Sequence, residues 1–220
     1  MRYTIFGESH GPAIGVVLEG VPPGLEFDME AMKRELSRRA PKADGFSTAR
    51  KEADEVHVLS GLFEGKTTGT PLTLVIQNSD QHSGDYEALR YTPRPSHGDY
   101  AGFIASKGCL DYRGGGHFSG RLTAPLVAAG SVAKQLLAQR NIDLASHISA
   151  IYGILDRAWE DVEELKEVAI KPFPVLDDGK GEEMRRAILE AKNDQDSVGG
   201  SIECAVWGLP AGLGAPDFGR

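Results

Sequence analysis

Three short segments of this 220-residue chain hold side chains that could do chemistry. The first, residues 7–11, reads GESHG and satisfies the G-x-S-x-G pattern of the nucleophile elbow in α/β-hydrolases. That elbow needs a strand before the serine and a helix after it, but only a few residues precede Ser9 and a strand signal at residues 14–18 follows it. Ser9 is therefore a weak candidate nucleophile, and the segment reads better as a glycine-flanked loop that holds a hydroxyl and an imidazole.

The second segment, RPSHGDY at residues 94–100, places His97 in a proline-stiffened loop. Asp99 follows two residues later, and a carboxylate so close would favour the protonated imidazolium. A histidine in this setting could serve as a general acid, although an ordinary solvated loop histidine fits the same residues. We interpret His57 and His147, each inside a strand signal, as structural residues.

The third segment, RGGGHFSGRLT at residues 113–123, combines three glycines with two arginines. Glycines let the backbone adopt anion-cradling conformations, and the helix that follows begins with a partial positive charge. Arg113 and Arg121 add charged donors for a phosphate or a carboxylate. Because no GK[ST] follows, the segment is not a P-loop, but it does indicate an anion site.

The chain has the composition of an ordinary globular protein with an acidic balance. Hydrophobic residues make up 40%, and 32 acidic against 24 basic residues give a net charge of −8. This charge argues against nucleic acid or an anionic membrane as a partner, so any anionic substrate must be met by local arginines. One basic cluster, around the end of the first predicted helix, equally fits charges that complement a helix dipole. It consists of Arg38, Arg39, Arg50 and Lys51.

The cysteines and the N-terminus favour a reduced, cytoplasmic protein. Cys109 and Cys204 lie far apart and form no CxxC pair. The N-terminus lacks a signal-peptide pattern, and no apolar run reaches the ~18 residues of a membrane span. We expect no metal, no nucleic acid and no membrane as partners.

Strand and helix signals alternate irregularly rather than as βα repeats, which favours an α+β fold class. Between residues 77 and 102 the sequence is polar and irregular, Pro93 and Pro95 oppose a helix, and such a long loop is usually functional or disordered. We expect strands at residues 14–18, 55–59, 72–77, 142–154 and 202–206. We expect helices between Asp28 and Pro41 and at residues 123–140, 160–168 and 182–192.

The sequence also contains an internal similarity between a segment near its start and one near its end. A shift of 188 residues aligns residues 9–25 with residues 197–213 and gives seven identities in seventeen positions. The similarity predicts a first half at residues 1–192 and a second, pseudo-related half at residues 193–220 that is cut short. Chance is the alternative, because several of the identities are glycines and prolines of tight turns.

Taken in order, these segments resemble one family, chorismate synthase. The resemblance runs from Thr4 to Arg220 and is carried by FGESHG, GVPPG, LSGLFEGKTTGTPL, RPSHGDY, DYRGGG and DSVGG. It implies a lyase that eliminates phosphate from 5-enolpyruvylshikimate 3-phosphate, with reduced FMN as cofactor and NAD(P)H as a candidate reductant. It also implies a sandwich of helices between antiparallel sheets, incomplete here, and a homotetramer of the full-length protein.

The resemblance implies roles for single residues. His10 would protonate or hydrogen-bond the reduced flavin, and His97 would be the general acid near the departing phosphate. Arg39 and Arg121 match arginines that hold the anionic substrate, and Ser9 matches a nearby hydroxyl donor. Three consecutive residues match cofactor-binding positions: His117, Phe118 and Ser119.

The sequence departs from the family pattern at several of these positions, which indicates a variant branch. His117 and Phe118 stand where arginine and serine are usual, and Lys42 or Arg50 would have to replace missing substrate arginines. The other departures are Leu122 for a glutamate, and Ala40 and Gly45 for arginines.

Two other functions stay open from the residues. One is an inactive anion-binding or assembly fragment that keeps the glycine loops without turnover. The other is a serine hydrolase that uses Ser9 as its nucleophile.

Overall fold

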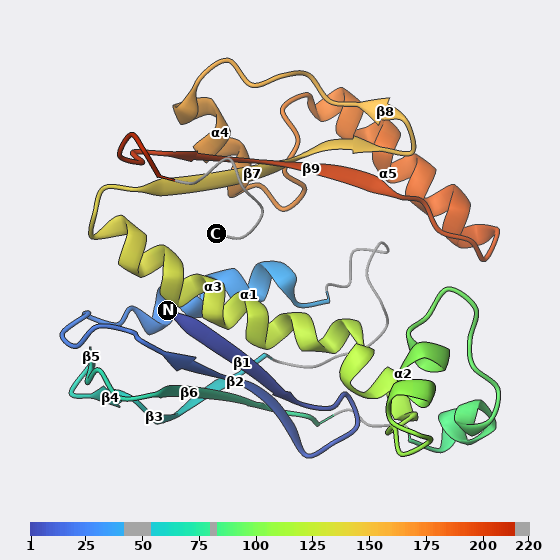
Figure 1. The fold of residues 1–220 in the computed structure, drawn as a ribbon. Helices are drawn as coiled ribbons and strands as arrows, with labels where there is room; N and C mark the ends of the chain where they lie inside the picture. The colour runs from blue at the N-terminus through green and yellow to red at the C-terminus, as the bar shows by residue number, and fades with distance from the viewer. Residues whose placement is uncertain (42–53, 80–82, 214–220) are drawn as a thin grey trace. The chain divides into compact units, whose positions relative to one another are not determined.

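The computed structural model describes residues 1–41, 54–79 and 83–213 (Figure 1). Within these ranges the chain forms two compact units, one up to Gln135 and one from Leu136 onward. The expected class is confirmed, because both units are mixed α+β with antiparallel sheets. No described helix is long and apolar enough to cross a membrane.

The first unit is built on a four-stranded sheet in the order β1-β2-β6-β3. Its strands are β1 (Arg2–Gly7), β2 (Ala13–Glu19), β3 (Val56–Ser60) and β6 (Leu72–Gln77), and β4 (Leu62–Phe63) pairs with β5 (Lys66–Thr67) in a small ribbon. Strand alternation puts one row of aliphatic side chains on one face. Each contributes about 1.5–3 kcal/mol on full burial. They are Ile14, Val16, Leu18, Leu72, Leu74 and Ile76.

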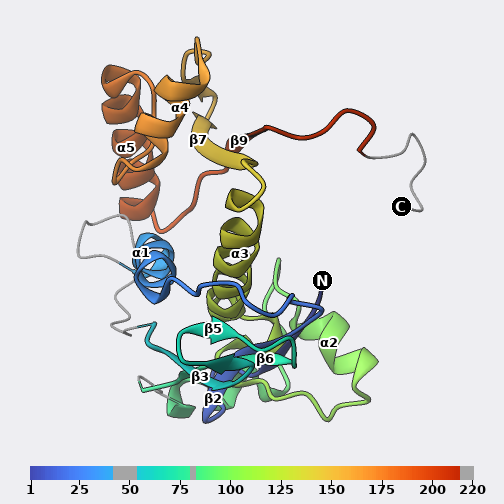
Figure 2. The ribbon, with the colours of Figure 1, turned by 90° about the vertical axis from the view of Figure 1, so that its left-hand side faces the viewer.

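Two long helices lie on the same side of this sheet (Figures 1 and 2). Helix α1 (Met29–Arg39) begins because the Asp28 carboxylate accepts from the N–H of Ala31 at 2.8 Å, and it ends before Pro41. Helix α3 (Thr123–Ala138) belongs to this unit as far as Gln135, whose side chain exchanges two hydrogen bonds with the Asp28 backbone. The pairing fixes α3, and with it the loop that precedes α3.

In the sequence between β6 and α3, the chain forms loops that carry much of the candidate site. These contain the 3-10 helices η1 (Ser83–Arg90), η2 (Arg113–Phe118) and η3 (Gly120–Leu122), and the short helix α2 (Asp99–Ala105). The expectation of an irregular, helix-free stretch up to residue 102 was wrong, because η1 and the first residues of α2 lie within it. The prolines exclude a helix only around themselves, and α2 begins four residues after Pro95.

Strand β1 was not expected, because its first residues are exposed and carry little apolar alternation. It places a strand before Ser9 after all, so that part of the argument against a nucleophile elbow was wrong. The residue after the loop nevertheless enters β2, which pairs antiparallel with β1, rather than a helix. Ser9 therefore lies in a β-hairpin, and the elbow geometry is absent at this loop.

The second unit is a three-stranded antiparallel sheet in the order β8-β7-β9, with two helices on one side (Figure 2). Its elements are β7 (Asp143–Ile151), β8 (Ile154–Leu155), α4 (Val162–Ala169), α5 (Asp178–Asn193) and β9 (Gly200–Trp207). The single strand expected at residues 142–154 is wrong, because Tyr152 and Gly153 adopt positive φ and turn the chain back as β8. Leu165 packs with Ala145 and Ala169, and Trp159 and Trp207 cover them.

The two segments that align in the internal similarity share a strand and two turn glycines with similar φ values. Strand β2 and strand β9 occupy equivalent positions, and each ends at a glycine with nearly equal φ, 76° at Gly20 and 78° at Gly208. The next aligned pair, Gly24 and Gly212, also agrees at 86° and 89°. These angles support the similarity, while the boundary near residue 193 stays a prediction.

Candidate functional site

Three consecutive glycines form the centre of the candidate site. Gly114, Gly115 and Gly116 have φ values of 59°, 85° and 53°, a left-handed run that other residues adopt only with strain. The chain also passes too close to its neighbours for any side chain. A Cβ on Gly116 would lie 2.3 Å from the Asp111 carbonyl oxygen. The loop, which we call the glycine loop (113–118), therefore needs glycine for its conformation and for its contacts.

The two candidate histidines pack against adjacent glycines of this loop. A Cβ on Gly114 would lie 2.5 Å from His10 Nε2, and one on Gly115 would lie 3.0 Å from His97 Nε2. The two imidazoles are 87 residues apart in the sequence, yet they touch consecutive residues of one loop. The structure thus brings together the two residues expected to be catalytic.

Ser9 and His10 lie in the hairpin loop between β1 and β2. Both are buried, with exposed fractions of 0% and 5%. The Ser9 N–H donates to the Gly116 carbonyl at 3.2 Å, and the His10 ring meets the Tyr86 ring edge-on at 5.0 Å. These contacts fix the hairpin loop to the glycine loop.

His97 is oriented by the residues on both sides of it. Its Nδ1 lies 2.6 Å from Asp99 Oδ1, which leaves Nε2 as the nitrogen that can exchange a proton with a substrate. Arg94 Nη2 is 3.3 Å from both ring nitrogens, a distance that places it over the imidazole face. Hydrogen bonds from the Arg94 guanidinium hold the pKa of Asp99 well below its usual range. The orienting carboxylate therefore stays ionised at neutral pH.

Arg39 and Arg121 share a single buried carboxylate. Arg39 Nη1 lies 2.9 Å from Asp54 Oδ2, and Arg121 Nη1 forms a very short ion pair with Asp54 Oδ1. The Asp54 side chain is 2% exposed and that of Arg121 is 3% exposed. The two guanidiniums thus converge on one carboxylate, and their planar forks are of the kind that binds the oxyanions of a substrate.

Asn78 connects this arginine pair to the hairpin loop. Its side-chain oxygen accepts from Arg121 Nε at 3.2 Å, and its amide nitrogen donates to the carbonyls of Glu8 at 3.0 Å and Gly11 at 2.8 Å. Neither Asn78 nor Asp54 was predicted from the sequence. The only signal was their position, Asn78 directly after β6 and Asp54 two residues before β3.

The three residues matched to cofactor-binding positions point to three different partners. His117 Nδ1 is 2.9 Å from the Gly7 carbonyl and must donate to it, because a carbonyl only accepts. Phe118 lies against Gly98 and Gly102 of the helix α2 segment. Ser119 Oγ accepts from the N–H of Arg121 at 3.3 Å and so caps η3.

A pair of carboxyl groups lies beside the glycine loop. Burial raises the pKa of Glu8, and a hydrogen bond to Asp111 raises it further. Asp111 accepts from Arg113 at 2.7 and 2.8 Å, and these bonds lower the pKa of Asp111 to about 2. Glu8 is therefore the member of the pair that holds a proton most readily.

Of the other departures from the family pattern, Ala40 and Leu122 are among the described residues. Ala40 ends α1, where its N–H donates to the Leu36 carbonyl, and Leu122 is buried in the core. Gly45, Lys42 and Arg50 lie outside the described residues.

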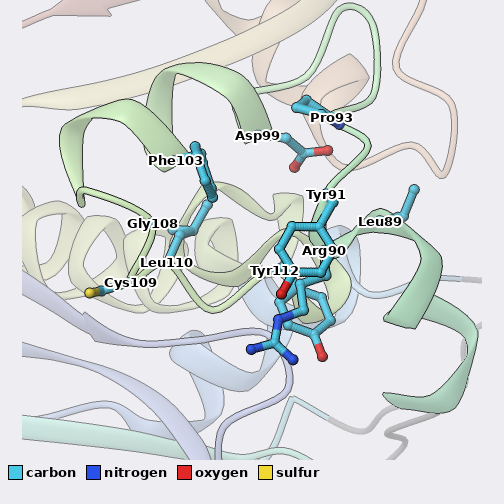
Figure 3. Close-up of a pocket in the computed structure, with 10 residues that line it drawn as sticks. All are labelled: Leu89, Arg90, Tyr91, Pro93, Asp99, Phe103, Gly108, Cys109, Leu110 and Tyr112. Carbon is cyan, nitrogen blue, oxygen red and sulfur yellow. The ribbon is translucent and has the colours of Figure 1, made fainter.

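Asp99 is one of the residues that line a cavity of about 270 Å³ (Figure 3). Figure 3 shows Arg90, Tyr91 and Tyr112 gathered together, with Phe103 and Leu110 farther along. The Arg90 guanidinium lies 5.4 Å from the Tyr91 ring centre and 5.9 Å from that of Tyr112. The cavity thus shares a wall with the carboxylate that orients His97.

Comparisons with known proteins agree on one family. The family description "Chorismate synthase" matches residues 1–220. The chorismate synthase of Aeropyrum pernix is 45% identical over 220 residues, which cover 99% of this chain and 58% of that protein. That of Methanobrevibacter smithii is 45% identical over 218 residues, covering 99% and 59%. A chorismate synthase crystal structure matches with a TM-score of 0.68 at 28% identity, covering 97% of this chain and 60% of the other.

The chain spans about 60% of the length of these relatives. The family match covers every described segment of the site, including the glycine loop and the loops that contain His10 and His97.

Proposed function

This chain belongs to the chorismate synthase family, and we propose that it supplies the N-terminal part of an enzyme that makes chorismate. The reaction is the trans-1,4-elimination of phosphate and a ring hydrogen from 5-enolpyruvylshikimate 3-phosphate. One observation carries the proposal, namely that His10 and His97 lie on consecutive glycines of one loop. The arginine pair on Asp54 stands in the same unit.

The substrate carries two carboxylates and a phosphate, so its binding needs several cations. We propose that Arg39 and Arg121 hold it, since their guanidiniums converge on Asp54 in the same unit as His10 and His97. Ser9 would donate a hydroxyl hydrogen bond nearby. Guanidinium groups suit this task because their planar fork binds oxyanions through two bonds at once.

His97 would act as the general acid as the carbon–oxygen bond to phosphate breaks. Asp99 accepts from Nδ1, so an imidazolium at this position has its transferable proton on Nε2, toward the glycine loop. Delivery of that proton to the departing phosphate would lower the negative charge that builds on its oxygens. The carboxylate would then stabilise the orientation of the neutral ring.

The family uses reduced FMN, which when bound supplies transient electron donation that eases loss of phosphate. The donor set of the described residues fits such a group. His117 donates through Nδ1 to the Gly7 carbonyl, so its Nε2 would be the nitrogen left to hydrogen-bond a reduced flavin. His10 would hydrogen-bond or protonate the flavin, and Phe118 and Ser119 complete the positions matched to the cofactor.

We also propose the remaining family properties for the longer protein. These are the sandwich of helices between two pseudo-related sheets, a homotetramer, a cytoplasmic location and NAD(P)H as a source of reduced flavin. The matching φ values of the glycines that follow β2 and β9 support the pseudo-related halves.

The direct test uses the longer protein that contains this chain, with 5-enolpyruvylshikimate 3-phosphate and reduced FMN under anaerobic conditions. Chorismate, followed by its absorbance, and inorganic phosphate should appear in equal amounts. Formation of neither product, with substrate binding intact, would favour an anion-binding protein without turnover. Stoichiometric labelling of Ser9 by a fluorophosphonate would instead favour a hydrolase, which the complete burial of Ser9 opposes.

A further inference from the structure

Phe118 packs against the backbone of the α2 segment at two glycines. A Cβ on Gly98 would lie 3.0 Å from Phe118 Cγ and 3.1 Å from Cδ1, and one on Gly102 would lie 2.5 Å from Cε2. Gly98 and Gly102 are four residues apart and so lie on the same face of the helix. The phenyl ring therefore occupies the space that two side chains would otherwise fill.

The same turn of α2 carries the group that orients His97. Asp99 is the first residue of α2, and its carboxylate lies 2.6 Å from His97 Nδ1. The imidazole in turn contacts Gly115 of the glycine loop. Loop and helix thus meet at two places, one at His97 and one at Phe118.

Helix α2 needs such an external support. It is seven residues long, and its N-cap, Gly98, provides no side-chain hydrogen bond to the first turn. Isolated helices of this length are unstable in water, so contacts with other elements determine where α2 lies. The aromatic ring of Phe118 is a large apolar contact at its first turn, and half of the side chain remains exposed on the other side.

We propose that Phe118 is a positioning residue for His97, acting through the glycine face of α2. The ring sets the separation between α2 and the glycine loop, and thereby the direction of His97 Nε2. The consequence for catalysis rests on the proposed function, in which His97 donates the proton. The consequence for the position of His97 rests on the contacts alone.

The first test follows the imidazole resonances of His97 by NMR in the 220-residue chain. Phe118→Ala should move the His97 Cε1–H and Cδ2–H signals, and Phe118→Leu, which keeps apolar bulk, should restore most of the shift. Ile104→Ala is the matched control, because Ile104 is an exposed apolar residue of the same helix. Unchanged His97 signals in Phe118→Ala would overturn the proposal.

A second variant tests the contact itself. Gly98 has φ −70°, so alanine fits the backbone there, and the three atoms nearest to its Cβ, at 3.0–3.2 Å, would all belong to Phe118. Gly98→Ala should therefore disturb His97 when Phe118 is present and have little effect in the Phe118→Ala background. Equal disturbance in both backgrounds would show that Gly98 and Phe118 act independently, contrary to the proposal.

Turnover of the longer protein gives the third readout. A displacement of about 1 Å can cost about 10²-fold in rate, so Phe118→Ala should lower kcat by about that factor with KM changed little. Phe118→Leu should recover most of kcat. If Phe118→Ala weakened only the affinity for reduced FMN, with kcat at saturating FMN and the His97 signals unchanged, Phe118 would be a cofactor contact and the proposal wrong. If the wild-type protein made no chorismate, the proposed function would fail, and the NMR experiments would still decide the positioning role.

Discussion

At the scale of single residues, the proposed chemistry depends on which nitrogen of His97 is left for the substrate. Replacement of His97 by alanine in the longer protein should lower turnover by about 10²–10⁴, the usual loss when a general acid is removed. Substrate binding should weaken far less, because the arginines remain. His57→Ala serves as the control, since His57 is an exposed residue of β3. A loss of less than about threefold in His97→Ala would place the proton donor elsewhere.

Arg121 illustrates how geometry rather than charge defines a residue. Its guanidinium reaches Asp54 through Nη1 and Asn78 through Nε at once, which one ammonium group cannot reproduce. Arg121→Lys should therefore weaken substrate binding measurably in calorimetry although the charge is kept. Equal affinity of the two proteins would mean that Arg121 is only a charge at the start of a helix.

The limits of sequence reasoning are also clearest at single residues. Ser9, His10, His97 and the glycine loop could be predicted because each stands in a compact motif. Asp54 and Asn78 could not, because each is one polar residue whose partners lie far away in the sequence. The shared carboxylate arises only when β3, β6 and α3 are in place.

At the scale of elements, the glycine loop should tolerate no side chain where the histidines touch it. Gly114→Ala combines a positive φ with a Cβ 2.2 Å from the His10 ring, so it should destabilise the chain by more than about 1 kcal/mol. Gly120→Ala is the matched control, because Gly120 has open space around it and no positive φ. Urea unfolding of both variants checks this, and equal midpoints would contradict it.

The loop that contains His97 should also become less stable in acid. The pKa of Asp99 is lowered by Arg94, so the native state binds fewer protons than the unfolded state. The stabilisation is fully present above about pH 4, the unfolded value for aspartate, and is lost progressively as the pH falls below it toward the lowered pKa of Asp99. Urea unfolding between pH 5 and pH 2 should show a smaller decline for Asp99→Asn than for wild type. Asp194→Asn, which removes an exposed charge outside the site, should decline like wild type.

Most elements could be predicted because caps and turn residues bound them. Asp28 and Pro41 delimit α1, and strand β6 falls where its apolar run predicts it. The pattern failed for β1, an edge strand with exposed side chains, and for the turn at Tyr152. In both cases pairing with a neighbouring strand, which the local sequence does not encode, decides the structure.

At the scale of the whole molecule, the chain spans about 60% of its relatives. We expect residues 1–220 by themselves to bind FMN weakly and to show no chorismate synthase activity. Phosphate or sulfate should still bind near Gly114–Gly116, where the donors are local. Calorimetry with FMN and with phosphate, together with a turnover assay, tests this. Tight stoichiometric FMN binding with turnover would show that this part of the family's length suffices.

The contact of His10 and His97 with adjacent glycines has a consequence for how the site can vary. Neighbouring Cα atoms are about 3.8 Å apart, so the single peptide unit between Gly114 and Gly115 sets the spacing of the two imidazole contacts. Substitutions around this peptide unit change the side chains that meet there, whereas insertion or deletion of one residue between the two glycines changes the spacing of the contacts. Insertions in surface loops are generally tolerated, but one glycine added between Gly114 and Gly115 would move the contacts of His10 and His97 apart.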